Sequence, residues 1–210
     1  MIGIIDLGIS NIVNVCKLLD RLKERFKLIN DPIFIKDCEI IIIPGVGSFD
    51  EGMKRLYNLD LVNELKKHCN NGKMLIGICL GLQLMMKHSE ESDGILGLNL
   101  FDQKIKKFFV NENEKKIHVG WNEIFFEKSD ELFFNFNNKN FYFTHSFYLD
   151  KFDAKILAST KFNDNSIKSF FIKNNLVGCQ FHLELSGKNG FNLMKKILEY
   201  KRNYEIKNYT

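Results

Sequence analysis

The first ninety residues alternate short apolar runs with segments of helical periodicity, and this alternation constrains the fold more than any other feature. The apolar runs have strand length and lie at residues 2–6, 39–43 and 74–78. Apolar residues recur at helical spacing at 11–26, 60–69 and 80–87. Asn11 and Asp60 stand where two of these helices need an N-cap. Strands that alternate with helices form βαβ units, so we expect a mostly parallel sheet flanked by helices.

The second half of the chain has a different pattern. Short strand-like runs are separated there by Asn, Lys and Asp, and they lie at 104–110, 121–126, 141–143, 154–159, 169–172 and 176–181. This pattern predicts hairpins and a mixed, partly antiparallel sheet. A last amphipathic helix is expected at about 191–200. Since no linker or repeat divides the chain, we expect one α/β domain over 1–203, followed by a polar tail over 204–210.

Composition excludes several classes of protein. The 30 Lys and Arg against 26 Asp and Glu give a net charge of +4, and the two signs are interspersed, which does not favour nucleic-acid binding. No apolar run reaches the roughly 18 residues of a membrane span, and the N-terminus lacks the pattern of a secretion signal. A cytoplasmic protein is expected. The five Cys include no Cys-x-x-Cys pair, which predicts reduced thiols and no metal site.

One of these cysteines lies in a pattern that suggests a nucleophile. Gly77-Ile78-Cys79-Leu80-Gly81 has a glycine two residues to each side of the thiol, between a predicted strand and a predicted helix. In a nucleophile elbow the glycines permit a sharp turn that exposes the side chain, and the helix N-terminus favours a thiolate. The alternative is a buried structural Cys in a tight turn.

His182 and Glu184 form the second candidate group. If this stretch is extended, both side chains lie on one face of a strand, where the carboxylate can orient the imidazole toward a thiol. Cys179, three residues before His182, then points to the opposite face, which argues against a metal site. The alternative is that His182 has only a packing role.

A glycine-rich loop follows the second predicted strand, at Pro44-Gly45-Val46-Gly47. Such a loop can present peptide N–H groups to a developing negative charge. It matches neither the dinucleotide-binding glycine spacing nor a P-loop, because no Lys-Ser or Lys-Thr follows. Tight turns alone are the alternative explanation.

Five motifs stand in order along the chain: Pro44-Gly45-Val46-Gly47-Ser48-Phe49 with Gly52-Met53, Gly77-Ile78-Cys79-Leu80-Gly81-Leu82-Gln83-Leu84, His118-Val119-Gly120-Trp121-Asn122, Phe143-Thr144-His145-Ser146-Phe147-Tyr148, and Gln180-Phe181-His182-Leu183-Glu184. Together they resemble the class I, triad-type glutamine amidotransferases, and among these the glutaminase subunits of imidazole glycerol phosphate synthase. The resemblance runs from end to end of the chain.

The resemblance implies a flavodoxin-like α/β fold and hydrolysis of glutamine to glutamate and ammonia, without a cofactor. Cys79 would attack the side-chain amide, His182 would carry the proton and Glu184 would orient the imidazole. It further implies an oxyanion hole at Val46, Gly47 and Leu80, substrate binding by Gln83, His145, Ser146 and Phe147, and a docking face at Trp121 and Asn122. The partner would be a (β/α)8 synthase that receives the ammonia within a heterodimer.

The chain departs from the family's pattern at Leu7, Ser10, Leu183 and Leu185. Leu183 replaces the usual Pro between His and Glu, and Leu185 replaces the basic residue that commonly follows. These changes leave the triad intact but leave the partner open. The first hypothesis is the histidine-pathway subunit. The second is a paralogue that aminates a nucleotide-sugar intermediate of surface glycans, and the third is a non-catalytic regulator.

Overall fold

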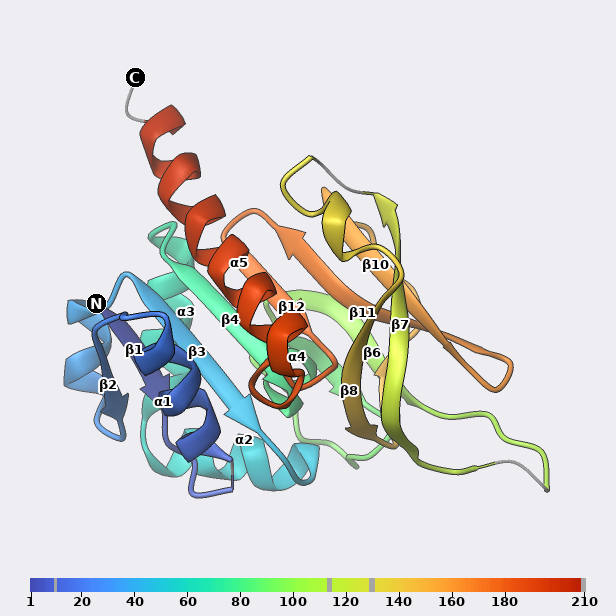
Figure 1. Ribbon diagram of the computed structural model, residues 1–210. Helices are drawn as coiled ribbons and strands as arrows, with labels where there is room; N and C mark the ends of the chain where they lie inside the picture. The colour runs from blue at the N-terminus through green and yellow to red at the C-terminus, as the bar shows by residue number, and fades with distance from the viewer. Residues whose placement is uncertain (10, 113–114, 129–130, 209–210) are drawn as a thin grey trace.

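A computed structural model describes residues 1–9, 11–112, 115–128 and 131–208; Ser10 lies outside these ranges. Its centre is a nine-stranded sheet with the order β2-β1-β3-β4-β12-β11-β10-β7-β8 (Figure 1). The strands of one half are parallel, namely β1 (Ile2–Ile5), β2 (Phe26–Ile29), β3 (Ile40–Gly45), β4 (Met74–Cys79) and β12 (Leu176–Cys179). The predicted parallel sheet is thus confirmed. Because β12 returns beside β4, the last part of the chain meets the end of the central strand.

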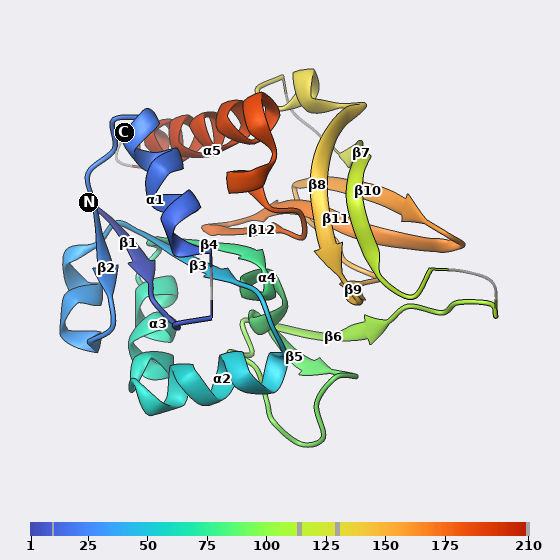
Figure 2. The ribbon, with the colours of Figure 1, turned by 60° about the horizontal axis from the view of Figure 1, so that its bottom comes forward.

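The other half of the sheet is antiparallel, as the second-half pattern predicts. It consists of β11 (Asn165–Lys173), β10 (Ile156–Phe162), β7 (His118–Lys128) and β8 (Lys139–His145). A smaller sheet contains β5 (Met86–Ser89), β6 (Phe101–Lys107) and β9 (Phe147–Leu149). Figure 2 shows how the antiparallel strands extend away from the helical half of the molecule.

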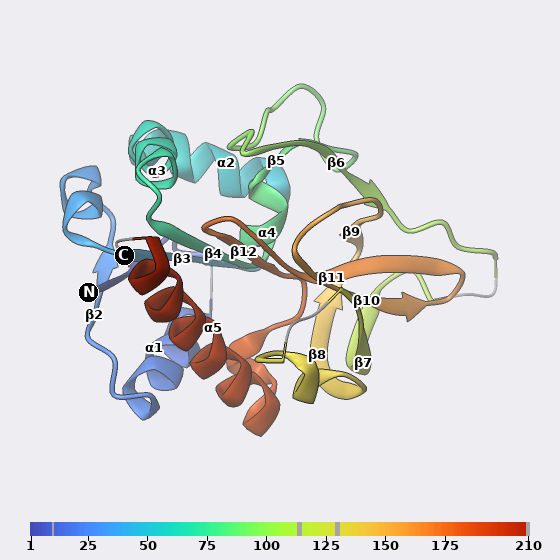
Figure 3. The same cartoon turned by 90° about the horizontal axis from the view of Figure 1, so that it is seen from above.

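Helices cover both faces of the parallel half (Figure 3). On one face lie α1 (Ile12–Arg21) and α5 (Gly187–Asn208), and on the other lie α2 (Phe49–Asn58), α3 (Leu61–Asn70) and the short α4 (Leu80–Leu84). Short 3-10 turns form η1 (Pro32–Asp37), η2 (Phe134–Phe136) and η3 (Leu183–Leu185). The result is the three-layer α/β arrangement expected from the alternating sequence pattern.

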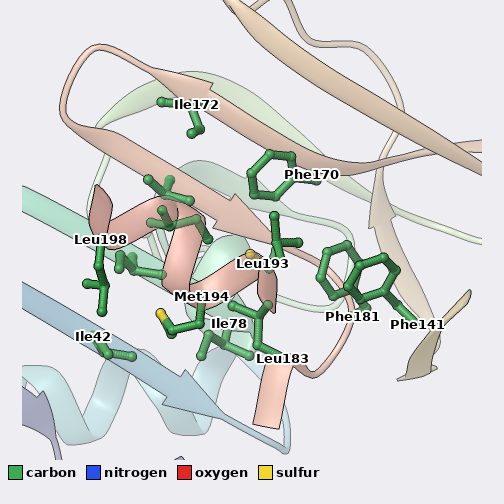
Figure 4. Packing of buried hydrophobic residues seen from close by; sticks show 14 of the residues in the cluster. Ile42, Ile78, Phe141, Phe170, Ile172, Phe181, Leu183, Leu193, Met194 and Leu198 are labelled. Carbon is green, nitrogen blue, oxygen red and sulfur yellow. The ribbon is translucent and has the colours of Figure 1, made fainter. Parts of the chain in front are cut away.

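Each face of the sheet has its own apolar core. Strand β3 shows why: Ile42 belongs to the cluster beneath α1 and α5, whereas Ile41 and Ile43 belong to the cluster beneath α2 and α3. Figure 4 shows the first cluster, in which Leu193 and Met194 of α5 lie against the sheet. Because side chains alternate between faces, a strand covered on both sides must be apolar throughout.

Helix α2 lies where only a loop is predicted. Its N-cap is Ser48, whose hydroxyl accepts the N–H of Glu51 at 3.3 Å. Ser-x-x-Glu is a capping signature, so the sequence did hold a signal for this helix. By contrast, the side chains of Asn11 and Asp60 make no capping hydrogen bond, although both residues hold the expected N-cap positions.

Other element ends also differ from the prediction. Helix α1 stops at Arg21, because Lys23 adopts a positive φ of 58° and the chain then enters β2. Helix α4 ends at Leu84, and the residues expected to continue it form β5. Helix α5 is longer than predicted and includes residues 204–208 of the expected tail, while 209–210 lie outside the described residues. Within the described chain, no helix has the length and apolar character of a membrane span.

Candidate active site

Cys79 lies at the junction of β4 and α4 in a strained conformation. Its φ is 53° and its ψ is −105°, values that few non-glycine residues adopt and that are typical of functional turns. A Cβ on Gly81 would lie 1.8 Å from the carbonyl oxygen of Ile43, and one on Gly77 would lie 2.5 Å from the carbonyl carbon of Gly81. Both glycines are therefore required by close backbone approach, which gives the Gly-x-Cys-x-Gly spacing a physical cause.

His182 and Glu184 form a buried pair. The Nδ1 atom of His182 lies 2.7 Å from Oε1 of Glu184, and both side chains are almost wholly inaccessible to solvent. The stretch is not an extended strand, because the chain turns into η3 at Leu183. The main-chain N–H of His182 donates to the carbonyl of Tyr142 at 2.9 Å, which fixes the turn against β8. The predicted pairing therefore occurs, but through a turn rather than through strand alternation.

The electrostatics of this group favour a charged imidazole. Burial by itself would lower the pKa of His182, but the adjacent Cys79 sulfur and the Glu184 carboxylate outweigh burial and raise the pKa above its ordinary value. Among the residues that the structure describes, no nitrogen or oxygen atom forms a hydrogen bond with the buried Nε2 of His182. Because Nδ1 faces Glu184, Nε2 is the nitrogen left to exchange a proton with the thiol.

A pocket of about 280 Å³ opens in front of Cys79. Its walls unite most of the residues that the sequence motifs point to, and it is lined by Val46, Gly47, Cys79, Leu80, Gln83, Glu91, Ile117, Thr144, His145, Ser146 and Phe147. Gln83 donates from its amide nitrogen to the carbonyl of Phe147 at 3.0 Å. The thiol of Cys79 faces the carbonyl of Thr144, with 3.7 Å between sulfur and oxygen. His182 and Glu184 are not part of the wall.

Glu91 is a pocket residue that the motifs do not reveal. One of its carboxylate oxygens accepts the N–H of Phe49 at 2.8 Å, which ties it to the start of α2. Burial is the main cause that raises the pKa of Glu91. In the sequence it stands in the polar run Ser89 to Asp93, which resembles a solvent-exposed loop, so only the fold shows that it faces the pocket.

One peptide N–H group of the glycine-rich loop already has a hydrogen-bond partner. The N–H of Val46 donates to the carbonyl of Ile9 at 3.1 Å, and Gly47 has a φ of 114°, a value accessible to glycine. A donor that already has a partner cannot also stabilise an oxyanion. Leu80 begins α4 directly after the thiol, at the end of the helix where backbone N–H groups lack intrahelical partners.

Trp121 and Asn122 point to opposite sides of β7. Trp121 is 57% exposed and shares an outward face with Val119 and Ile117, which are 56% and 51% exposed. Asn122 instead directs its amide inward, to the Nε2 atom of His118 at 3.2 Å and to the carbonyl of Lys161 at 2.9 Å. The side chains of Trp121 and its two apolar neighbours are therefore exposed on one side, whereas the amide of Asn122 bonds to groups on the other side.

Comparison with known proteins shows the family of this chain. Residues 3–198 match the family model described as glutamine amidotransferase class-I. The chain is 39% identical over 199 residues to "Imidazole glycerol phosphate synthase subunit HisH" of Prochlorococcus marinus strain MIT 9312, covering 94% of this chain and 97% of that protein. It is 33% identical over 202 residues to the protein of the same name from Thermotoga maritima, with coverages of 94% and 96%.

Among solved structures, one titled "Crystal structure of glutamine amidotransferase" superposes with a TM-score of 0.72 at 16% identity, covering 95% of this chain and 98% of that one. At that identity the likeness concerns the fold alone, and it agrees with the predicted α/β class. The family itself rests on the match over residues 3–198 and on the relatives in sequence. The chain belongs to the class I glutamine amidotransferases.

Proposed function

We propose that this chain is the glutaminase subunit of an imidazole glycerol phosphate synthase and that Cys79, His182 and Glu184 are its catalytic triad. The observation that carries the proposal is the strained Cys79 elbow, which faces a pocket beside a buried His182–Glu184 pair. The relatives named HisH support the histidine pathway over amination of a nucleotide sugar. The pocket and the paired His182 argue against a non-catalytic regulator.

The pocket suits one glutamine. Its volume of about 280 Å³ accommodates a small amino acid, and its wall includes the polar side chains of Gln83, Glu91 and His145. We assign the α-carboxylate and α-amino group of the substrate to Gln83 and to the segment 145–147. Glu91, an acidic group in the same wall, is the counter-ion we propose for the substrate's ammonium. The side-chain amide then reaches toward Cys79.

Hydrolysis proceeds through a thioester. The Cys79 sulfur, its proton taken by Nε2 of His182, attacks the amide carbon of glutamine and forms a tetrahedral oxyanion. The N–H group of Leu80 stabilises that oxyanion, and the N–H groups of the Val46–Gly47 loop join it once the Val46 N–H has left the carbonyl of Ile9. His182 then protonates the leaving nitrogen, and ammonia departs. A water molecule, deprotonated by His182, attacks the thioester carbon and releases glutamate together with the free thiol.

The partner is a (β/α)8 cyclase that docks on the outward face of β7. Trp121, Val119 and Ile117 form an apolar strip there, and Ile117 also lines the pocket. Apolar aromatic anchors of this kind are typical of interface centres. A partner on this strip can receive ammonia without its loss to solvent, and we place the heterodimer in the cytoplasm with other biosynthetic enzymes. Leu185, partly exposed, offers an apolar contact where the family commonly has a basic one.

The test is reconstitution with the cyclase encoded in the same genome. We expect glutamine-dependent synthase activity from the pair, and loss of that activity in Cys79→Ala with retention when ammonium salts replace glutamine. Loss of both activities in a folded complex would contradict the division of labour. Activation by a sugar-modifying synthase rather than by the histidine-pathway cyclase would move the chain to the second pathway.

A further inference from the structure

Three polar side chains outside the triad form a continuous chain of hydrogen bonds. The amide nitrogen of Asn122 lies 3.2 Å from Nε2 of His118, and Nδ1 of His118 lies 3.1 Å from Nε2 of His145. Nδ1 of His145 lies 2.9 Å from the carbonyl oxygen of Phe147 in the pocket wall. Both imidazoles are buried, with 3% and 7% of their surface exposed.

The direction of every hydrogen bond in this chain follows from the two ends. A carbonyl oxygen only accepts, so Nδ1 of His145 carries a hydrogen. Burial lowers the pKa of His145 to about 3 and that of His118 to about 4, so both rings are neutral and each has one N–H. Nε2 of His145 is then a bare acceptor, and Nδ1 of His118 must be the donor to it. Nε2 of His118 in turn accepts from Asn122.

The Asn122 end agrees independently. Its amide nitrogen also donates to the carbonyl of Lys161 at 2.9 Å, and its amide oxygen accepts the N–H of Glu123 at 2.8 Å. These two backbone groups fix which end of the amide is nitrogen. All donors in the chain therefore point the same way, from β7 toward the pocket.

At the pocket, the chain of hydrogen bonds ends on the carbonyl oxygen of Phe147, which a second residue also uses as an acceptor. The Phe147 carbonyl accepts from both His145 and Gln83, so its two lone pairs are used by two pocket residues. The His118 ring is held in place by stacking, with ring centroids 4.5 Å from Phe143 and 4.4 Å from Phe162. The orientation of the His118 imidazole is therefore set before any substrate arrives.

We propose that Asn122, His118 and His145 are positioning residues that hold the 145–147 segment in the geometry that binds glutamine. The proposal rests on the proposed function, since it concerns the same pocket. None of the three touches the reacting atoms. Because Asn122 follows Trp121 directly on β7, the chain of hydrogen bonds also connects the strand proposed to contact the partner with the 145–147 segment of the pocket wall.

The first test reads the tautomers directly. In nitrogen-15 NMR spectra at pH 7, His118 and His145 should both show the Nδ1–H tautomer, which is the minor form of a free imidazole, and both should stay neutral down to pH 5. An Nε2–H tautomer on either ring would overturn the proposal. This measurement needs neither substrate nor partner, so its result is independent of the proposed function.

The second test separates positioning from chemistry. In a Cys79→Ala background, His118→Phe keeps the stacked ring but removes both nitrogens, and we expect glutamine to bind about tenfold more weakly by calorimetry. His118→Asn can place its amide nitrogen near the original Nδ1, so it should stay within about threefold of the parent. Equal affinity for all three chains would reject the proposal.

A control reports on the triad. With Cys79 present, the rate at which iodoacetamide alkylates this thiol should be the same in His118→Phe as in the parent chain, because the small reagent does not need the 145–147 segment. A large drop in that rate would indicate general disorder of the site, and would also count against a positioning role. If His118→Phe fails to fold, Asn122→Leu takes its place in the binding measurement, because it removes the donor that holds Nε2 of His118, and an affinity equal to that of the Cys79→Ala parent would reject the proposal. If the Cys79→Ala protein binds no glutamine, the proposed function fails. The tautomers of His118 and His145 would still show whether the chain of hydrogen bonds exists.

Discussion

The N–H of Val46 donates to the carbonyl of Ile9, 3.1 Å away, and so turns one predicted oxyanion donor away from Cys79. The thiol of Cys79, the imidazole of His182 and the pocket already have the geometry that the proposed reaction needs, and the N–H of Val46 is the group that does not. The loop therefore has to change before the oxyanion hole is complete, and exposure of Val46 at 40% leaves it accessible to a partner.

The isolated chain should accordingly be a poor glutaminase. Loss of a single oxyanion donor lowers kcat by about 100-fold to 1000-fold in other hydrolases. We expect an increase in kcat of at least about 100-fold when the cyclase and its acceptor are added, as partner binding shifts the loop population. Glutamate formation by the chain alone, by the pair, and by the pair with acceptor measures this. Full turnover from the chain alone would show that the Val46 contact does not limit catalysis.

Much of the parallel sheet was predictable, since buried strands such as residues 40–43 are apolar on both faces and end at Pro and Gly. The order of the strands was not, because β12 joins β4 across about 100 residues of sequence, and no local pattern encodes that pairing. The turn at Cys79 was indicated by the local Gly-x-Cys-x-Gly spacing, although the approach of Gly81 to Ile43 that requires this glycine is a long-range contact.

The remaining parts of the site depend on long-range contacts. Glu91 is held at the pocket by the hydrogen bond that it accepts from the N–H of Phe49, 42 residues away. Asn122 turns inward because its amide nitrogen donates to the carbonyl of Lys161 and to Nε2 of His118. His182 and Glu184 were paired from an assumed strand, yet the pair forms at a turn fixed by Tyr142. In each case the residue type was visible in the sequence, but the partner that orients it was not.

Removal of triad members should have graded effects. His182→Ala should abolish detectable glutamine hydrolysis in the complex, whereas Glu184→Gln should retain more activity. The reason is that the carboxylate orients and stabilises the imidazole while the imidazole itself moves the proton. Steady-state kinetics with glutamine and, separately, with ammonium salts measure the difference. Equal losses in both variants would argue that Glu184 has more than an orienting role.

Among the five thiols, Cys79 should be alkylated most readily at neutral pH. Burial is the leading cause that raises the pKa of the other four, and for Cys69 it does so to about 12, so these have little thiolate. Cys16 is the strictest comparison because it is partly exposed, while Cys79 is 5% exposed. Limited iodoacetamide treatment followed by mass spectrometry locates the label. Preferential labelling of Cys16 or Cys179 would contradict activation by His182.

Gly81→Ala should destabilise the chain far more than Gly72→Ala does. The new Cβ would lie 1.8 Å from the Ile43 carbonyl oxygen, so α4 must move away from β3. We expect the free energy of unfolding to fall by about 2–4 kcal/mol. Gly72→Ala is the matched control: its φ of 74° strains an alanine, but nothing lies within 4 Å, so about 1 kcal/mol is expected. Similar losses in urea unfolding for both variants would mean that the elbow does not need close packing.

Acid should weaken the fold through the two buried imidazoles. The pKa of His118 is lowered by burial to about 4, and that of His145 is lowered to about 3, chiefly by burial and then by His118. A group with a lowered pKa in the folded state binds its proton more readily when unfolded. Its contribution to stability is therefore complete above the unfolded pKa near 6.5 and is lost as the pH falls toward the folded value.

The free energy of unfolding of the parent chain should thus decline between pH 7 and pH 4. In His118→Phe one of these titrating groups is absent, so the decline should be smaller, even if the variant is less stable at pH 7. Urea unfolding at several pH values measures both slopes, and His88→Phe, at an exposed site outside the chain of hydrogen bonds, serves as the control. Identical slopes for His118→Phe and the parent chain would show that His118 is not held neutral by the fold, and Nε2 of His118 could then not accept the hydrogen bond assigned to it from Asn122.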